Sequence, residues 1–174
     1  MNRLTRIGIA AALAAASALA ISQAPPAGGP PAGAGPGGPP SPEAQAKAAI
    51  ETRQGLFKVI SNQNGPIGGM NRPNAPAADL AVVARNAARI QTLSEIIPDV
   101  FMANTSAVTS VKTRALNGIW TSQADFKAKA DALGKAAAAV GAAAKSGDQA
   151  ATKAAAAEMG KTCGGCHDTF RGPA

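Results

Sequence analysis

From residue 41 onward, apolar residues recur every three or four positions, which is the spacing of amphipathic helices. Almost no stretch alternates apolar and polar residues with a period of two, so strands are not predicted. The predicted helices cover, approximately, residues 41–65, 77–98, 122–145 and 148–170. Four amphipathic helices joined mostly by short links predict an all-α fold, an antiparallel up-and-down four-helix bundle.

Capping residues and prolines set the expected helix ends. Ser41-Pro42 suits the start of the first helix, which is expected to end near Pro66. Pro98 marks the expected end of the second helix. Ser122, followed three residues later by Asp125, is typical of a capping box at the start of the third helix.

The predicted core is thin. The helices carry many alanines, and the whole chain has only four Phe, one Trp and no Tyr. Such small side chains allow close helix packing but leave one region in need of a large apolar group. Residues 98–121 form a long irregular connection, and connections of this length usually have a function.

The N-terminal part does not resemble this helical domain. Arg3 and Arg6 precede an apolar run of about fourteen residues, shorter than the roughly twenty needed to span a membrane. A small-x-small pattern follows, so residues 1–20 are predicted to be a cleaved signal peptide, with position 24 as the alternative end. Residues 21–41 are mostly Pro, Gly and Ala and are predicted to be a flexible tether. The folded domain is expected over residues 42–174, after export to the periplasm.

The net charge of +7 excludes little by itself. The basic residues are dispersed rather than clustered, and aromatic residues make up 3% of the chain, so nucleic-acid binding is not predicted. No nucleophile or acid–base pair stands out either, and an enzyme is not expected.

The most specific motif is Cys163-x-x-Cys166-His167 on the last predicted helix. Two thiols at this spacing match the two vinyl groups of a porphyrin, and the next residue then projects toward the iron. The motif therefore predicts one covalently bound haem c, with His167 as the axial iron ligand. A dithiol redox site, a zinc site and a structural disulfide are the alternatives. The dithiol site would need a βαβ context, and the zinc site would need more ligands than the motif offers. A disulfide would leave His167 without a role.

The ligand on the other side of the iron is less certain. His167 is the only histidine, which excludes a second histidine ligand within one chain. Met159 precedes it by eight residues on the same helix, about 12 Å along the axis, and cannot reach the opposite face. Met70 and Met102 lie in predicted connections and stay open as ligands.

At this point the sequence resembles the cytochrome c′ family, the class II c-type cytochromes, over about residues 43–171. The resemblance rests on Arg53-Gln54, on residues 112–116 leading to Ile119-Trp120, and on residues 160–171 around the haem motif. The chain departs from the family at residues 117–118, where Asn-Gly replaces a frequent Pro-Glu, and in its long tether.

The resemblance implies a five-coordinate, high-spin iron with an apolar residue over its open face. That residue falls at Phe57, with Leu56 beside it, whereas low-spin relatives have Met at this position. Ordinary core packing is the alternative role for Phe57. Arg53 lies on the apolar face of its helix and is expected to bind a haem propionate, although its stem could pack while its head reaches water.

The remaining roles also come from the resemblance. Gln54, Thr105 and Ser106 are expected near the propionate edge, and Trp120, Phe170 and Arg171 in the haem pocket. The implied function is binding of small diatomic gases (NO, CO) together with electron transfer to an unidentified redox partner. The alternative is a low-spin electron-transfer cytochrome with His and Met ligands. The family also implies a homodimer formed through the first two helices. The shortness of the N-terminal apolar run predicts a protein that is not membrane-embedded.

Overall fold

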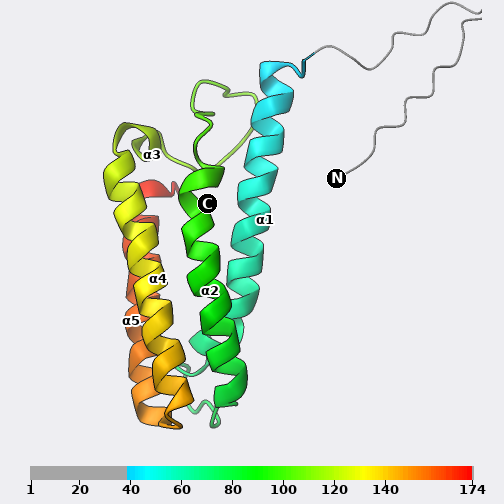
Figure 1. Ribbon diagram of the computed structural model, residues 1–174. Coiled ribbons are helices and arrows are strands. Elements are labelled where there is room, and N and C mark those ends of the chain that lie inside the picture. Colours follow the sequence, from blue (N-terminus) through cyan, green and yellow to red (C-terminus); the bar gives the residue numbers. More distant parts are fainter. Residues whose placement is uncertain (1–38, 174) are drawn as a thin grey trace, which may run out of the picture. The chain divides into compact units, whose positions relative to one another are not determined.

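The computed structural model describes residues 39–173, which form four long helices and one short one (Figure 1). The helices are α1 (Pro42–Gly69), α2 (Leu80–Val100), α3 (Gly118–Thr121), α4 (Gln123–Lys145) and α5 (Gln149–Phe170). Successive long helices run in opposite directions (Figure 1). Around the bundle α1 contacts α2, α2 contacts α4, α4 contacts α5, and α5 meets α1. The predicted all-α four-helix bundle is therefore confirmed.

Two predicted segments lie largely or wholly outside the described residues. The signal peptide, residues 1–20 with the alternative end at 24, lies entirely outside them. So does the tether of residues 21–41, except for its last three positions. Both stay predictions.

Local hydrogen bonds account for most helix starts. Ser41, Asp79 and Asp148 each accept a hydrogen bond from backbone amides in the first turns of α1, α2 and α5. Gly147, with φ of 79°, provides the left-handed turn between α4 and α5. Ser122 makes no such bond with its side chain, so the capping box predicted at the start of α4 is wrong. The single turn of α3 leads into α4 there instead.

The prolines end their helices later than expected. Pro66 and Pro98 both lie inside their helices, and α1 continues to Gly69 and α2 to Val100. A proline loses one helical hydrogen bond and crowds the carbonyl four residues before it, but the residues that follow it can still bond to carbonyls of the preceding turn. As a result, α2 continues for two residues beyond Pro98 and ends next to Phe101.

The interface between α2 and α4 is unusually close. A Cβ atom at Gly134 of α4 would lie 2.6 Å from the Oγ of Ser94 on α2. Two turns further along α4, a Cβ atom at Gly141 would lie 3.7 Å from the Cβ of Ala87, an ordinary van der Waals contact. The absence of a side chain at Gly134 therefore lets α4 approach Ser94 of α2 more closely than a larger residue would.

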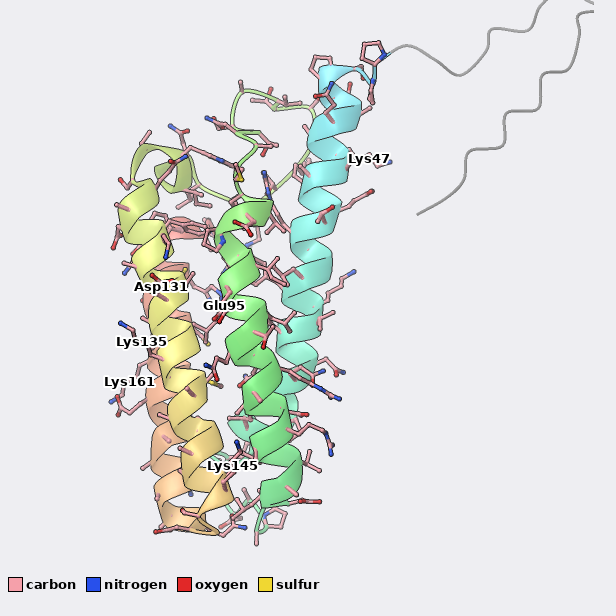
Figure 2. All side chains as sticks on the ribbon, in the orientation of Figure 1. Lys47, Glu95, Asp131, Lys135, Lys145 and Lys161 are labelled. Atoms are coloured by element: carbon pink, nitrogen blue, oxygen red, sulfur yellow. The ribbon has the colours of Figure 1, made fainter. Side chains whose placement is uncertain are left out.

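Most charged side chains lie on the outside of the bundle, with Arg53 as a buried exception. Lys47, Glu95, Asp131, Lys135, Lys145 and Lys161 project from the outer faces of four different helices (Figure 2). Three ion pairs within single helices, such as Lys127 with Asp131 at 2.8 Å, are all solvent-exposed, and pairs of this kind contribute little to stability. The fold therefore depends on its apolar interior.

Candidate functional site

The interior contains a cavity of about 570 Å³. Residues of α1 and α5 form most of its wall, α2, α3 and α4 close its sides, and residues 113–115 and Arg171 lie at its edge. The lining is predominantly apolar, and the volume is within the usual range for sites of small molecules and cofactors, about 300–1,000 Å³. The space that the small side chains leave unfilled is therefore concentrated in this cavity.

The haem motif lies on the wall of this cavity. Cys163, Cys166 and His167 belong to the last two turns of α5, and all three are half-buried and line the cavity. Residues three and four apart share one face of a helix, so the two sulfurs and the imidazole are presented together. Both thiols are free, and 4-residue spacing from Cys163 to His167 directs the ring to the same side as the sulfurs.

The electrostatics keep these groups neutral. Burial raises the pKa of both cysteine thiols. Burial also lowers the pKa of His167, and the nearby cations of Arg171 and Arg114 lower it further, against an opposing effect of Asp168. A neutral imidazole has a nitrogen lone pair to donate to a metal.

All four phenylalanines of the chain line the cavity. Their rings form a continuous row, with centroids 6.2 Å apart for Phe57–Phe101, 5.0 Å for Phe101–Phe126 and 5.2 Å for Phe126–Phe170. Phe57 and Phe170 were predicted to be site residues, whereas Phe101 and Phe126 were not singled out. Because phenylalanine is rare in this alanine-rich chain, its positions were the signal that would have identified Phe101 and Phe126.

Arg53 is buried, with only 3% of its surface exposed. Its Nε donates to the carbonyl of Val100 at 2.8 Å, Nη1 to the Oγ1 of Thr105 at 2.8 Å, and Nη2 to the carbonyl of Ala103. Burial lowers its pKa from an ordinary value that is very high, so the side chain stays charged. The structure therefore brings together two residues expected at the propionate edge, Arg53 and Thr105.

The other two residues expected at that edge are more exposed. Gln54 lines the main cavity and also a neighbouring open cavity of about 630 Å³, formed with residues 105–117. Thr105 and Ser106 line only this second cavity. Ser106 uses its backbone N–H to bond the Asn104 side chain at 2.9 Å.

Two predicted pocket residues do not line the main cavity. Leu56 is half-buried and packs against the core beside Phe57. Trp120 packs behind Phe101, to whose carbonyl its indole Nε1 donates a hydrogen bond of 2.8 Å. Arg171 does line the cavity, next to the end of α5.

The described methionines are unevenly placed with respect to the cavity. Met159 lines it, from the same helix as His167. Met70 caps the far end of α1, thirteen residues after Phe57 and so about 20 Å along the axis. Met102 is 77% exposed on the segment after α2. Neither Met70 nor Met102 is among the lining residues.

A short backbone clasp holds the end of α5. The amide of Leu116 donates to the carbonyl of Phe170 at 3.0 Å, and the amide of Gly172 donates to that of Arg114 at 2.8 Å. The Nε of Arg114 also reaches the carbonyl of Gly172. Sequence patterns gave no sign of this pairing, because it involves only a few residues far apart in the chain.

A haem c group fits this site. The cavity is large and apolar, it carries a histidine nitrogen and two thiols on one wall, and no buried side-chain polar atom among the described residues lacks a hydrogen-bond partner there. Three cationic side chains, Lys58, Arg114 and Lys129, also line the cavity and would be available to pair with the carboxylates of the haem. Within residues 39–173, no helix is long and apolar enough to cross a membrane.

An all-α bundle with a Cys-x-x-Cys-His motif on its last helix, facing an apolar cavity, is typical of bundle-type c-type haem proteins. The family model of cytochrome c′ matches residues 48–171. Cytochrome c′ from Rubrivivax gelatinosus is 40% identical over 123 residues, which are 71% of this chain and 93% of that protein. The chain belongs to the cytochrome c′ family, which confirms the predicted resemblance, and its cofactor is covalently bound haem c.

Solved structures agree with this assignment. Cytochrome c prime from Shewanella frigidimarina is 37% identical, with a TM-score of 0.63, and the match covers 74% of this chain and 97% of that one. A ferrous variant of cytochrome c prime from Alcaligenes xylosoxidans with bound NO is 25% identical, with a TM-score of 0.62 and coverage of 74% and 97%.

Proposed function

We propose that this protein is an exported haem c protein whose iron is five-coordinate and high-spin, binds NO and CO on its open side, and transfers electrons. Cys163 and Cys166 attach the porphyrin, and His167 is the axial ligand. The observation that carries the proposal is the position of Phe57. It lines the cavity from α1, where the family's low-spin members have Met, and Met70 and Met102 do not line that cavity.

The chain's own residues define the chemistry of the site. A bound haem would supply an iron that can change between the ferric and ferrous states and take a small ligand. The neutral His167 provides one nitrogen ligand from α5. Phe57 and Phe101 line the cavity with hydrocarbon and offer no hydrogen-bond donor. Bound dioxygen is polar and is stabilised by a hydrogen bond, which such a wall does not provide. NO and CO depend less on a hydrogen bond of this kind.

A related structure with bound NO, the ferrous variant from Alcaligenes xylosoxidans, supports gas binding by a bundle of this kind. Electron transfer uses the same iron, and the dispersed basic residues suit contact with an acidic partner. Export to the periplasm rests on the N-terminal residues 1–20. The homodimer stays a prediction, although Val59 on α1 and Ile96 on α2 are exposed apolar side chains on the two helices it would use.

Absorption and electron paramagnetic resonance spectra of the purified holoprotein test the proposal. We expect high-spin bands without a sixth ligand, and a shift of the ferrous spectrum on addition of CO. A low-spin spectrum that CO does not change would contradict it and would assign the protein to the Met-ligated electron-transfer cytochromes. Met102→Leu and Met70→Leu variants would then identify the ligand.

A further inference from the structure

Arg53 joins α1 to a distant part of the chain. Its three hydrogen bonds reach Val100 at the end of α2 and Ala103 and Thr105 in the segment that follows, 47 to 52 positions away in sequence. A guanidinium group has five N–H donors, so three are used here and two remain. The buried charge is therefore largely compensated by carbonyl and hydroxyl oxygens of this one segment.

Beyond Met102, whose amide still bonds the carbonyl of Asp99, the segment up to residue 107 has few backbone hydrogen bonds of its own. In this part of the described chain, the amides of residues 103–107 make no hydrogen bond to a backbone carbonyl. The amide of Ser106 bonds only to the neighbouring Asn104 side chain. Backbone groups without a regular partner need side chains to order them, and Arg53 supplies three such bonds.

The same guanidinium contacts the aromatic rings of the cavity wall. Its central carbon lies 4.6 Å from the ring centroid of Phe101 and 5.4 Å from that of Trp120, within the range of cation–π interactions. Trp120 in turn bonds the Phe101 carbonyl. Phe101 is thus held through both its ring and its backbone, and its ring meets that of Phe57.

We propose that Arg53 is a positioning residue for the distal wall, the part of the cavity lining formed by Phe57 and Phe101. By holding residues 100–105 it fixes the ring of Phe101, which limits the space into which Phe57 can move, and so it slows the approach of a ligand to the open side of the iron. This inference rests on the proposed function, because it concerns access to that same open side. It differs from propionate binding, for which only the two remaining N–H groups are available.

Arg53→Lys and Thr105→Val test the proposal in the holoprotein. The lysine keeps the charge but cannot reach three acceptors in a fork, and the valine removes one acceptor with little change of shape. We expect CO to bind the ferrous Arg53→Lys protein about three- to tenfold faster, with a smaller increase for Thr105→Val. Hydrogen exchange of peptides covering residues 100–108 should also become faster in both variants, at the hydrogen-bonded amides of Phe101, Met102, Ser106 and Val108.

The decisive measurement combines Arg53→Lys with Phe57→Ala. If Arg53 acts through the two rings, the lysine should have almost no effect on the CO rate once Phe57 is gone. Arg89→Lys is the matched control, since Arg89 is exposed on α2 and bonds only the Gln63 side chain at 3.1 Å. It should leave both the rate and the exchange unchanged.

Several results would overturn the inference. Unchanged hydrogen exchange in Arg53→Lys would show that the residue does not hold the segment. An effect on the CO rate that persists fully in the Phe57→Ala background would exclude the route through the rings. A shifted redox potential with an unchanged CO rate would assign Arg53 to a propionate alone. If the unsubstituted protein binds no CO, the proposed function fails instead, and the exchange data alone decide whether Arg53 holds the segment.

Discussion

The α2–α4 interface and the space between α1 and α5 lie in the same bundle but are built in opposite ways. At the first, glycine and alanine bring two helices so close that even a methyl group at Gly134 would meet Ser94. At the second, the helices meet only weakly, and a cavity of about 570 Å³ separates much of their length.

The difference lies in where the large side chains are placed. The alanine- and glycine-rich face of α4 packs against α2 on one side, whereas the four phenylalanines and Arg53 surround the opening on the other. Close packing at one interface holds the bundle together while the opposite pair of helices stays apart. The bundle can therefore provide room for a large planar cofactor without a larger core.

The largest effect is expected from removing the haem from the cavity between α1 and α5. A Cys163→Ser/Cys166→Ser variant should lose covalent haem, because no thioether can form. The free energy of unfolding should fall by about 3–4 kcal/mol, since a tightly bound group that stabilises only the folded state is lost. Mass spectrometry of the denatured protein and urea unfolding measure the two effects.

Thr169→Ser is the control for this prediction, because Thr169 is exposed on the same helix and does not line the cavity. It should keep the haem and the stability. A double-serine protein that still carries haem after denaturation would show that the attachment residues are wrong.

A smaller loss is expected from forcing the close interface apart. Gly134→Leu should lower the free energy of unfolding by about 1–3 kcal/mol, because the side chain would collide with Ser94 and with the Gln91 backbone nearby. Gly55→Leu is the matched control, since a Cβ at Gly55 of α1 has no atom within 4 Å. There the loss of a mid-helix glycine should stabilise the protein by about 0.5–1 kcal/mol. Equal effects at both positions in thermal unfolding would refute the contrast.

The two regions also differ in how far the sequence alone predicts them. Helical periodicity and the Cys163-x-x-Cys166-His167 motif are local patterns, so the four helices and the placement of the motif on α5 could be predicted. The resemblance to the family supplied Phe57, which does line the cavity. A contact such as that of Arg53 with Ala103 could not be predicted, because it joins residues fifty positions apart in an irregular segment. The same reason hid the clasp at Arg114, while Trp120 was expected in the pocket and instead supports Phe101 from behind.

The mildest test separates the cavity wall from the packing beside it. Phe57 is 37% exposed and lines the cavity, whereas its neighbour Leu56 packs against the core outside it. Phe57→Ala should speed CO binding to the ferrous protein by about tenfold, which corresponds to roughly 1.4 kcal/mol, because the apolar obstacle over the open side is gone. Leu56→Ala should lower the stability but leave the rate unchanged. Flash photolysis measures the CO-binding rates of both variants. If the two rates change alike, Phe57 acts only as core packing. The contrast between the close α2–α4 interface and the cavity between α1 and α5 then does not extend to ligand binding.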